Sequence, residues 1–103
     1  MPLTGFDLDG VITAGIQPDA GAVVITGRTF AEYDQTCKDL AQRFPVYIRG
    51  VGDPDDSEHK GLFKAVMVKM LGVTKFYEND LEQAELIRRD NLSCEVVVVG
   101  STI

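Results

Sequence analysis

Short apolar runs alternate along this chain with segments whose apolar residues recur every three or four positions. That alternation is typical of α/β proteins built on a mostly parallel sheet. The run from Val96 to Val99 is apolar throughout, as expected of a strand that is buried on both faces. We predict five strands, near residues 3–7, 22–26, 45–49, 73–77 and 95–99. The expected fold is a five-stranded, mostly parallel, doubly wound sheet with helices on both faces.

The first of three predicted helices follows the second strand. It begins where Thr29 and Glu32 have the spacing of a capping box. Apolar residues then recur at three- and four-residue steps as far as Phe44, and Pro45 ends the helix. No helix is predicted in the two irregular connections, residues 10–21 and 50–59.

The second and third helices are predicted from apolar recurrence and from their end signals. The second covers residues 60–71 before Gly72, and Lys64 and Lys69 are expected to face solvent. Its core side is expected to carry Leu62, Phe63, Val66, Met67, Met70 and Leu71. The third runs from Asn79 or Asp80 to Arg88 and Arg89, whose charges suit the negative end of the helix dipole.

Composition limits the class of protein. A chain of 103 residues suits a single domain, residues 1–103, with one core. The net charge of −6 disfavours sequence-independent binding to nucleic-acid backbones. Cys37 and Cys94 lack metal-ligand spacing, so we expect reduced, buried thiols. Because there is no signal-peptide pattern and no apolar stretch of membrane-spanning length, we expect a cytoplasmic protein that does not enter membranes.

Polar residues gather where the predicted strands end. In open parallel sheets, ligands bind outside the carboxyl ends of the strands, so these residues are the candidate site. They are Asp7, Asp9 and Gly10 after the first strand, Thr26, Gly27 and Arg28 after the second, Glu78, Asn79 and Asp80 after the fourth, and His59, Lys60 and Gly61 where the second helix opens.

This combination favours phosphoryl transfer. Asp7 and Glu78 repel a phosphate unless a hard divalent cation lies between them, and Mg²⁺ accepts such oxygen ligands. With Lys60 neutralising the phosphoryl oxygens, Asp7 can act as the nucleophile and form an aspartyl-phosphate. Asp9 can then protonate the leaving oxygen and activate water. Thr26 and the N–H of Gly27 are expected to hold the phosphoryl group, and Arg28 either contacts the substrate or forms a salt bridge across the helix start.

Four segments together resemble the motifs of the haloacid dehalogenase-like (HAD) superfamily. Residues 6–13 (Phe-Asp-Leu-Asp-Gly-Val-Ile-Thr) resemble its first motif and residues 24–28 (Val-Ile-Thr-Gly-Arg) its second. Lys60-Gly61 resembles the third motif, and the acidic end at Tyr77-Glu78 resembles the fourth. The motifs occur in the family's order over most of the chain.

The resemblance implies a Rossmann-like core and a phosphatase that uses Asp7, Asp9, Thr26, Lys60 and Glu78 in the roles given above. It also implies that the Asp9 backbone carbonyl is a Mg²⁺ ligand. The short connections leave no room for a cap insertion, so the chain resembles capless members of the superfamily. Some of these form tetramers whose subunits cover each other's sites, so the resemblance allows a homo-oligomer.

Several assignments stay open at this level. The second ligand of the fourth motif is Asn79, Asp80 or Glu82, and Asp80 is equally suited to cap the third helix. Lys64 competes with Lys60, which we prefer because it begins the helix. The acidic run at residues 53–58 is expected to be a solvated loop, with a metal clamp as the alternative. The substrate is either a phosphorylated small molecule or a nucleic-acid end.

Two other functions compete with a Mg²⁺-dependent phosphatase. One is a degenerate HAD-like domain that serves as a non-catalytic binding or assembly subunit. The other is a receiver-like signalling module, but its phosphorylated Asp is expected to end the third strand, and here Arg49-Gly50 stands at that place. The sequence therefore favours the phosphatase.

Overall fold

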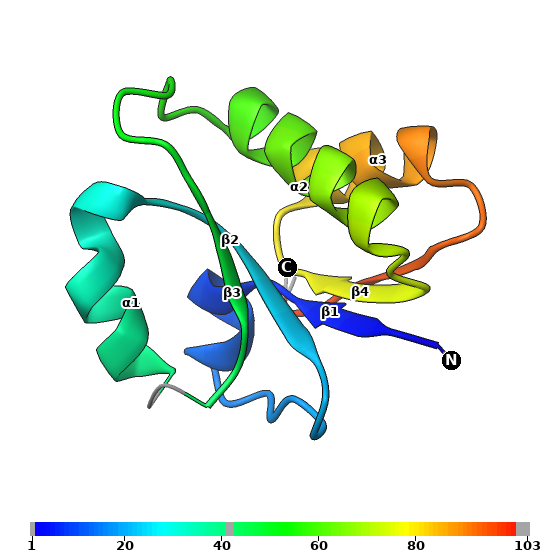
Figure 1. Cartoon of the computed structure of the whole chain (residues 1–103). Helices are drawn as coiled ribbons and strands as arrows, with labels where there is room; N and C mark the ends of the chain where they lie inside the picture. The colour runs from blue at the N-terminus through cyan, green and yellow to red at the C-terminus, as the bar shows by residue number, and fades with distance from the viewer. Residues whose placement is uncertain (1, 41–42, 101–103) are drawn as a thin grey trace.

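All five predicted strands form one parallel sheet in the computed structural model, which describes residues 2–40 and 43–100. The strands lie in the order β3-β2-β1-β4-β5 (Figure 1). Their bounds are β1 Thr4–Phe6, β2 Val23–Thr29, β3 Val46–Arg49, β4 Lys75–Glu78 and β5 Glu95–Val98. The prediction of an α/β, Rossmann-like, doubly wound sheet is confirmed.

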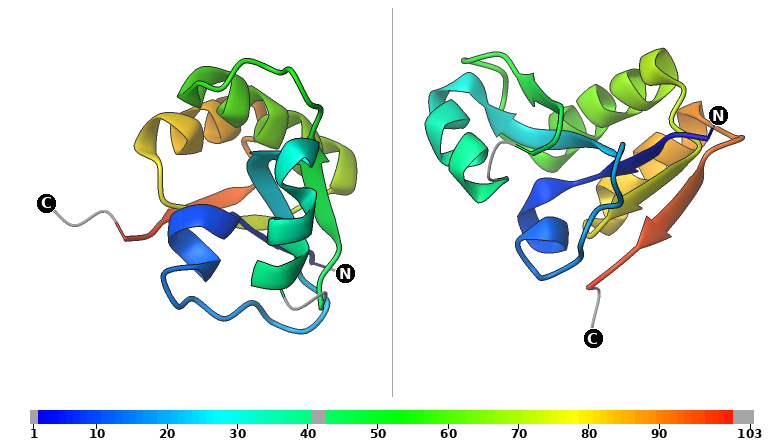
Figure 2. Two further views of the ribbon diagram at one scale, coloured as in Figure 1. Left: turned by 90° about the vertical axis from the view of Figure 1, so that its left-hand side faces the viewer. Right: turned by 60° about the horizontal axis from the view of Figure 1, so that its bottom comes forward.

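Helices cover both faces of the sheet. Helices α2 (Ser57–Leu71) and α3 (Leu81–Asp90) lie side by side on one face, and α1 (Tyr33–Asp39) lies on the other (Figures 1 and 2). The side chains of β2 alternate accordingly: Val23 and Ile25 pack in the core beneath α2 and α3, and Val24 packs with Leu8 and Leu40 on the opposite face. The continuous apolar strands are explained by this burial from both sides.

The helix boundaries differ from the predicted ones in two places. The capping box of Thr29 and Glu32 is present, but it opens a short 3₁₀ turn, Phe30–Glu32, and α1 ends at Asp39. Phe44, predicted to be helical, lies outside the helix, and residues 41 and 42 are outside the described part. Helix α2 begins three residues earlier than expected, because the side chain of Asp56 caps it by accepting a hydrogen bond from the His59 N–H at 2.8 Å.

Helix α2 also presents a different face to the core than predicted. Its buried residues are Gly61, Lys64, Ala65 and Val68, whereas Leu62, Val66 and Met70 are exposed. The expectation that Lys64 faces solvent is therefore wrong, as is the placement of Met70 in the core. Small residues on the inner face let α2 lie close to both the sheet and α3.

The connection after β1 contains one turn of distorted helix, η1 (Leu8–Ile12), where no helix was predicted. Asp7 begins this turn, since its side chain accepts a hydrogen bond from the Leu8 N–H. Gly10 has φ of 81°, a left-handed conformation that favours glycine. A Cβ at this position would lie 2.1 Å from the Asn79 side chain, so the loops after β1 and β4 are in close contact.

The order of the strands places a crevice between β1 and β4. The chain builds the sheet outwards from β1 through β2 to β3, and then returns to place β4 on the other side of β1. Such a switch point opens the carboxyl edge of a parallel sheet for ligands. Asp7 follows β1 and Glu78 ends β4, so one carboxylate lies on each side of it.

In the described ranges, none of the helices has the length and apolar character needed to cross a membrane.

Gly61→Ala is expected to lower the free energy of unfolding by about 1–3 kcal/mol, because a new methyl group would overpack the contact between α2 and α3. A Cβ there would meet Leu86 Cδ1 at 2.7 Å and the Gln83 backbone at 3.1 Å. Denaturant unfolding measures the effect. Gly50→Ala is the control, since nothing lies within 4 Å of its added Cβ. Equal stability of the two variants would contradict the close approach of the helices.

Candidate active site

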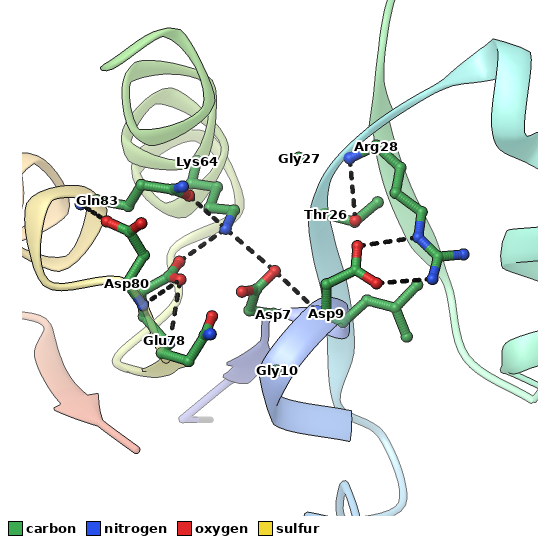
Figure 3. Close-up of polar contacts among 12 residues, drawn as sticks. Asp7, Asp9, Gly10, Thr26, Gly27, Arg28, Lys64, Glu78, Asp80 and Gln83 are labelled. Atoms are coloured by element: carbon green, nitrogen blue, oxygen red, sulfur yellow. Dashed lines mark hydrogen bonds and ion pairs between the residues drawn. The ribbon is translucent and has the colours of Figure 1, made fainter. Parts of the chain in front are cut away.

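A polar cavity of about 340 Å³ opens at the carboxyl edge of the sheet. Asp7 and Lys64 form its inner end, since both line it and are almost fully buried. Its sides come from the segments after β1 and β4, from the last residues of β2 and from the start of α2 (Figure 3). The structure thus brings Asp7, Asp9, Gly27, Arg28, Lys60 and Asp80 to one cavity, as the sequence predicted. Thr26 and Glu78 do not line it.

Asp7 is held from both its backbone and its side chain. Its N–H donates to the Tyr77 carbonyl at 2.9 Å, which fixes the residue beside β4. Its Oδ1 accepts the Leu8 N–H at 2.8 Å and lies 3.0 Å from Lys64 Nζ. Among the described residues, no donor reaches Oδ2. One carboxylate oxygen is therefore fixed, and the other is available to a ligand.

Lys64 joins the two sides of the crevice. Its ammonium group lies 3.0 Å from Asp7 Oδ1 and donates to Glu78 Oε1 at 2.8 Å and to Gln83 Oε1 at 2.6 Å. The second oxygen of Glu78 accepts the N–H groups of Asn79 and Asp80, each at 3.1 Å. All three N–H donors of Lys64 thus have acceptors, which a buried ammonium requires.

Lys60, which was predicted to neutralise the phosphoryl oxygens, lines the cavity, but the ammonium beside Asp7 belongs to Lys64. Because α2 starts at Ser57, Lys60 lies in its first turn, and its ammonium pairs with Asp55 at 3.2 Å. Lys64, one turn later, occupies the position beside Asp7. A signal was present in the sequence: Gly61, Ala65 and Val68 form a narrow stripe that includes Lys64. The larger apolar residues, which also recur at helical spacing, led to the prediction that the opposite face packs in the core.

Asp9 turns away from Asp7 and binds Arg28 in a bidentate pair (Figure 3). The distances are 3.0 Å from Nε to Oδ2 and 2.7 Å from Nη2 to Oδ1. Arg28 also contacts Asp39 Oδ2 at 2.8 Å, and the hydrogen bonds that it donates to Asp9 raise the pKa of its guanidinium. Of the roles predicted for Arg28, the salt bridge is present, with Asp9 and Asp39 as its partners, and contact with the substrate stays a prediction.

Thr26 supports the cavity from beneath. It is fully buried, and its Oγ1 accepts the Arg28 N–H at 3.1 Å. Gly27 does line the cavity, where a Cβ would lie 2.9 Å from Cδ of Lys60. Glycine at this position lets the aliphatic part of Lys60 lie against the backbone.

Arg49 is a structural residue that sequence reasoning missed. It ends β3, its side chain is 1% exposed, and its Nε donates to the Gly27 carbonyl at 2.7 Å. Its Nη1 donates to the Pro54 carbonyl at 2.8 Å. Arg49 therefore ties the end of β2 to the loop before α2. A charged residue at the end of a strand gives no sequence signal for such a role.

The structure distinguishes the three candidates for the second Mg²⁺ ligand of the fourth motif, which are Asn79, Asp80 and Glu82. Asp80 caps α3: its Oδ1 accepts the Gln83 N–H at 3.0 Å, and its Oδ2 accepts the Ser57 hydroxyl at 3.0 Å. Asn79 lines the cavity against Gly10. Glu82 is exposed and does not line the cavity. The capping role of Asp80 is confirmed, and its oxygens are already engaged.

The acidic run before α2 lies at the surface. Asp56, Glu58 and His59 come within 4.8 Å of one another, and all three are exposed. The cap of α2 accounts for this grouping, since Asp56 accepts the His59 N–H. The same hydrogen bonds lower the pKa of Asp56.

Burial dominates the electrostatics of Asp7. Loss of solvent raises the pKa of this carboxyl, Lys64 partly counteracts the rise, and Glu78 adds to it, so that the pKa reaches about 8. Two buried carboxylates share one ammonium, and the cluster is one positive charge short of neutral when both are ionised.

This donor set fits a hard divalent cation. Among the described residues that line the cavity, Asp7 offers a carboxylate oxygen and Asn79 an amide, and none offers a thiolate or an imidazole. A cation on the Oδ2 side of Asp7 would supply the charge that Lys64 alone leaves uncompensated. Asp7 and Asn79 are therefore the side chains placed to hold Mg²⁺. Glu78, which the resemblance made a Mg²⁺ ligand, is fully buried behind them, and both of its oxygens already accept hydrogen bonds.

No protein-family model, curated protein or solved structure matches this chain.

Lys64→Met is expected to destabilise the protein by about 3–5 kcal/mol at neutral pH, because it removes the buried ammonium that both acidic side chains, Asp7 and Glu78, contact. Lys60→Met is the matched control on the same helix. Its ammonium forms one ion pair with the exposed Asp55, so its loss is expected to have little effect. Denaturant unfolding compares the two. A larger loss of stability in the Lys60 variant than in the Lys64 variant would contradict the buried cluster of Asp7, Lys64 and Glu78.

Asp7→Asn is expected to stabilise the protein above neutral pH when divalent cations are removed. The folded-state pKa is raised to about 8 from 3.8, so the contribution of Asp7 to stability is lost as pH rises through this range. Asn does not titrate, so the advantage of the variant should grow from near zero at about pH 4 to several kcal/mol at about pH 8, at about 1.4 kcal/mol per pKa unit. Thermal unfolding in EDTA measures it, with the exposed Asp90→Asn as control. A pH-independent difference would contradict a buried charge at Asp7.

Proposed function

We propose that this chain is a Mg²⁺-dependent phosphomonoester phosphatase that forms an aspartyl-phosphate at Asp7. The observation that carries the proposal is the Lys64 ammonium held between Asp7 and Glu78 at the switch point of the sheet. A nucleophilic carboxylate beside a fixed cation suits the attack on a phosphate, whose negative charge must be balanced.

The resemblance to the HAD-like superfamily supports the same function. Its first, second and fourth motifs correspond to segments that end β1, β2 and β4, which meet at one edge. Its third motif supplies the lysine, and in this chain we assign that role to Lys64 in place of Lys60. The nearby loops carry no inserted domain, as in capless members.

In the first step, Asp7 attacks the phosphorus atom through Oδ2 while Lys64 holds Oδ1. The bond from phosphorus to the ester oxygen breaks, and that oxygen leaves with a proton from Asp9. Mg²⁺, when bound, offsets the negative charge of the phosphoryl oxygens. The Gly27 backbone, fixed by Arg49, forms the wall beside the phosphoryl group.

In the second step, a water molecule attacks the phosphorus of the aspartyl-phosphate. Asp9 accepts the water proton, the bond to Asp7 breaks, and inorganic phosphate leaves. For both steps, the Asp9 carboxyl group must leave its pair with Arg28 and turn towards Asp7. Its side chain is 59% exposed, so this rotation meets little packing resistance.

Beryllofluoride with Mg²⁺ tests the assembled site without knowledge of the substrate, because it mimics an acyl-phosphate on an aspartate. We expect it to raise the melting temperature of the wild type by several degrees, as a ligand at about a hundred times its dissociation constant adds about 2.7 kcal/mol. Asp7→Asn should abolish the shift. Asp90→Asn, an exposed aspartate at the end of α3, should retain it.

Two outcomes would count against the phosphatase. A wild type that shows no shift would favour the non-catalytic binding or assembly subunit. A shift that survives in the Asp7 variant would place the bound group elsewhere.

A further inference from the structure

We propose that the site selects phosphomonoesters whose leaving group carries no negative charge, and that it prefers a leaving group with an ammonium group. This inference rests on the proposed phosphatase. It follows from the side chains that surround the path by which a leaving group must exit the cavity.

The buried position of Asp7 determines the path by which the leaving group exits the cavity. A phosphorus atom bound to this carboxylate lies at the inner end of the cavity, beside Lys64. The rest of the ester must extend outwards past the more exposed lining residues, which we call the mouth. The mouth consists of Asp9, Arg28, Glu32, Asp55 and Lys60.

The cations of the mouth are already engaged by carboxylates of the chain. Arg28 lies between Asp9 and Asp39, at 2.7 and 2.8 Å, and Asp39 remains its partner when Asp9 turns towards Asp7. Lys60 Nζ lies 3.2 Å from Asp55, whose side chain is 84% exposed. Glu32 adds a carboxylate that accepts only a backbone N–H, from Thr29, among the described residues. Carboxylates therefore outnumber cations around the leaving group, and a second anionic group on the substrate would meet net negative charge.

The cavity also offers no surface for a nucleobase. In the described part of the chain, its lining residues are charged, amide or glycine residues, and none is aromatic or aliphatic. Stacking on aromatic rings is the usual source of affinity for single-stranded nucleic acids. A nucleic-acid end would therefore bring additional phosphates to an acidic mouth without a compensating contact.

What the mouth offers instead is hydrogen-bond acceptors. Hydroxyl and ammonium groups donate to carboxylates, and bonds between two charged groups are the stronger kind. A small polyhydroxylated or amine-bearing monoester fits both the charge and the volume of about 340 Å³. Leaving-group charge is then the property that separates good ligands from poor ones.

Three compounds of equal carbon number test this directly: glucosamine 6-phosphate, glucose 6-phosphate and 6-phosphogluconate. Their leaving groups are cationic, neutral and anionic. Each is titrated against the thermal shift that beryllofluoride and Mg²⁺ produce, and free phosphate is measured in the same wells to separate competition by the ester from competition by released phosphate. We expect glucosamine 6-phosphate to compete about tenfold better than 6-phosphogluconate at low ionic strength, with glucose 6-phosphate between them. Salt at about 0.5 M should reduce the ratio.

Variants that each remove one negative charge from the mouth test whether its carboxylates cause the preference for a cationic leaving group. Glu32→Gln and Asp55→Asn should each reduce the ratio between the cationic and anionic competitors about threefold. Gln at position 32 can still accept the Thr29 N–H, so the turn before α1 is kept. Glu95→Gln is the matched control, because Glu95 is exposed and begins β5 at the opposite edge of the sheet. It should leave the ratio unchanged.

The outcomes separate the two proposals. Without a beryllofluoride shift, the phosphatase fails first and the inference fails with it. With the shift present, equal competition by the three compounds, a reversed order, or no competition by any of them overturns the charge preference and leaves the phosphatase standing.

Discussion

Two carboxylates buried on either side of the central crevice can share one site only because the Lys64 ammonium lies between them. The three groups come from the end of β1, the end of β4 and the middle of α2. Gln83 accepts the remaining bond and adds α3 to the cluster. The close approach of α2 to α3 at Gly61 accompanies the contact between Lys64 and Gln83. The packing of α2 against α3 and the balance of charge at the site therefore depend on the same residues.

The strands were predictable because each is a short apolar run bounded by polar residues, and a sheet covered on both faces requires this pattern. The cavity followed from the same reasoning, since parallel strands bring their carboxyl ends to one edge. The orientation of α2 was not predictable from its apolar residues. Leu62, Val66 and Met70 recur at helical spacing, but they face outwards, and the inner face is built from smaller residues around one lysine. Residue size, rather than hydrophobicity, decided which face packs.

Side-chain pairing at the cavity rim depends on contacts between segments distant in sequence, and local patterns do not contain this information. Arg28 and Asp9 are 19 positions apart, and Arg49 and Gly27 are 22 apart. The sequence could place Asp9, Gly27 and Arg28 near the site, but it could not say that Thr26 would accept a backbone N–H or that Arg49 would donate to two carbonyl groups. Capping was the exception: the role of Asp80 at α3 was foreseen because an N-cap is a local interaction.

The dispersed origin of the charged cluster bears on how the chain folds and opens. Asp7, Lys64 and Glu78 lie in three separate elements, so no single hairpin or helix pair can form the cluster by itself. Local opening of a segment such as the loop before α2 leaves the cluster intact. Only loss of the pairing between the central strands separates its members. Amide protons of β1 and β4 are then expected to exchange through global unfolding, and a ligand on Asp7 slows that exchange throughout the sheet.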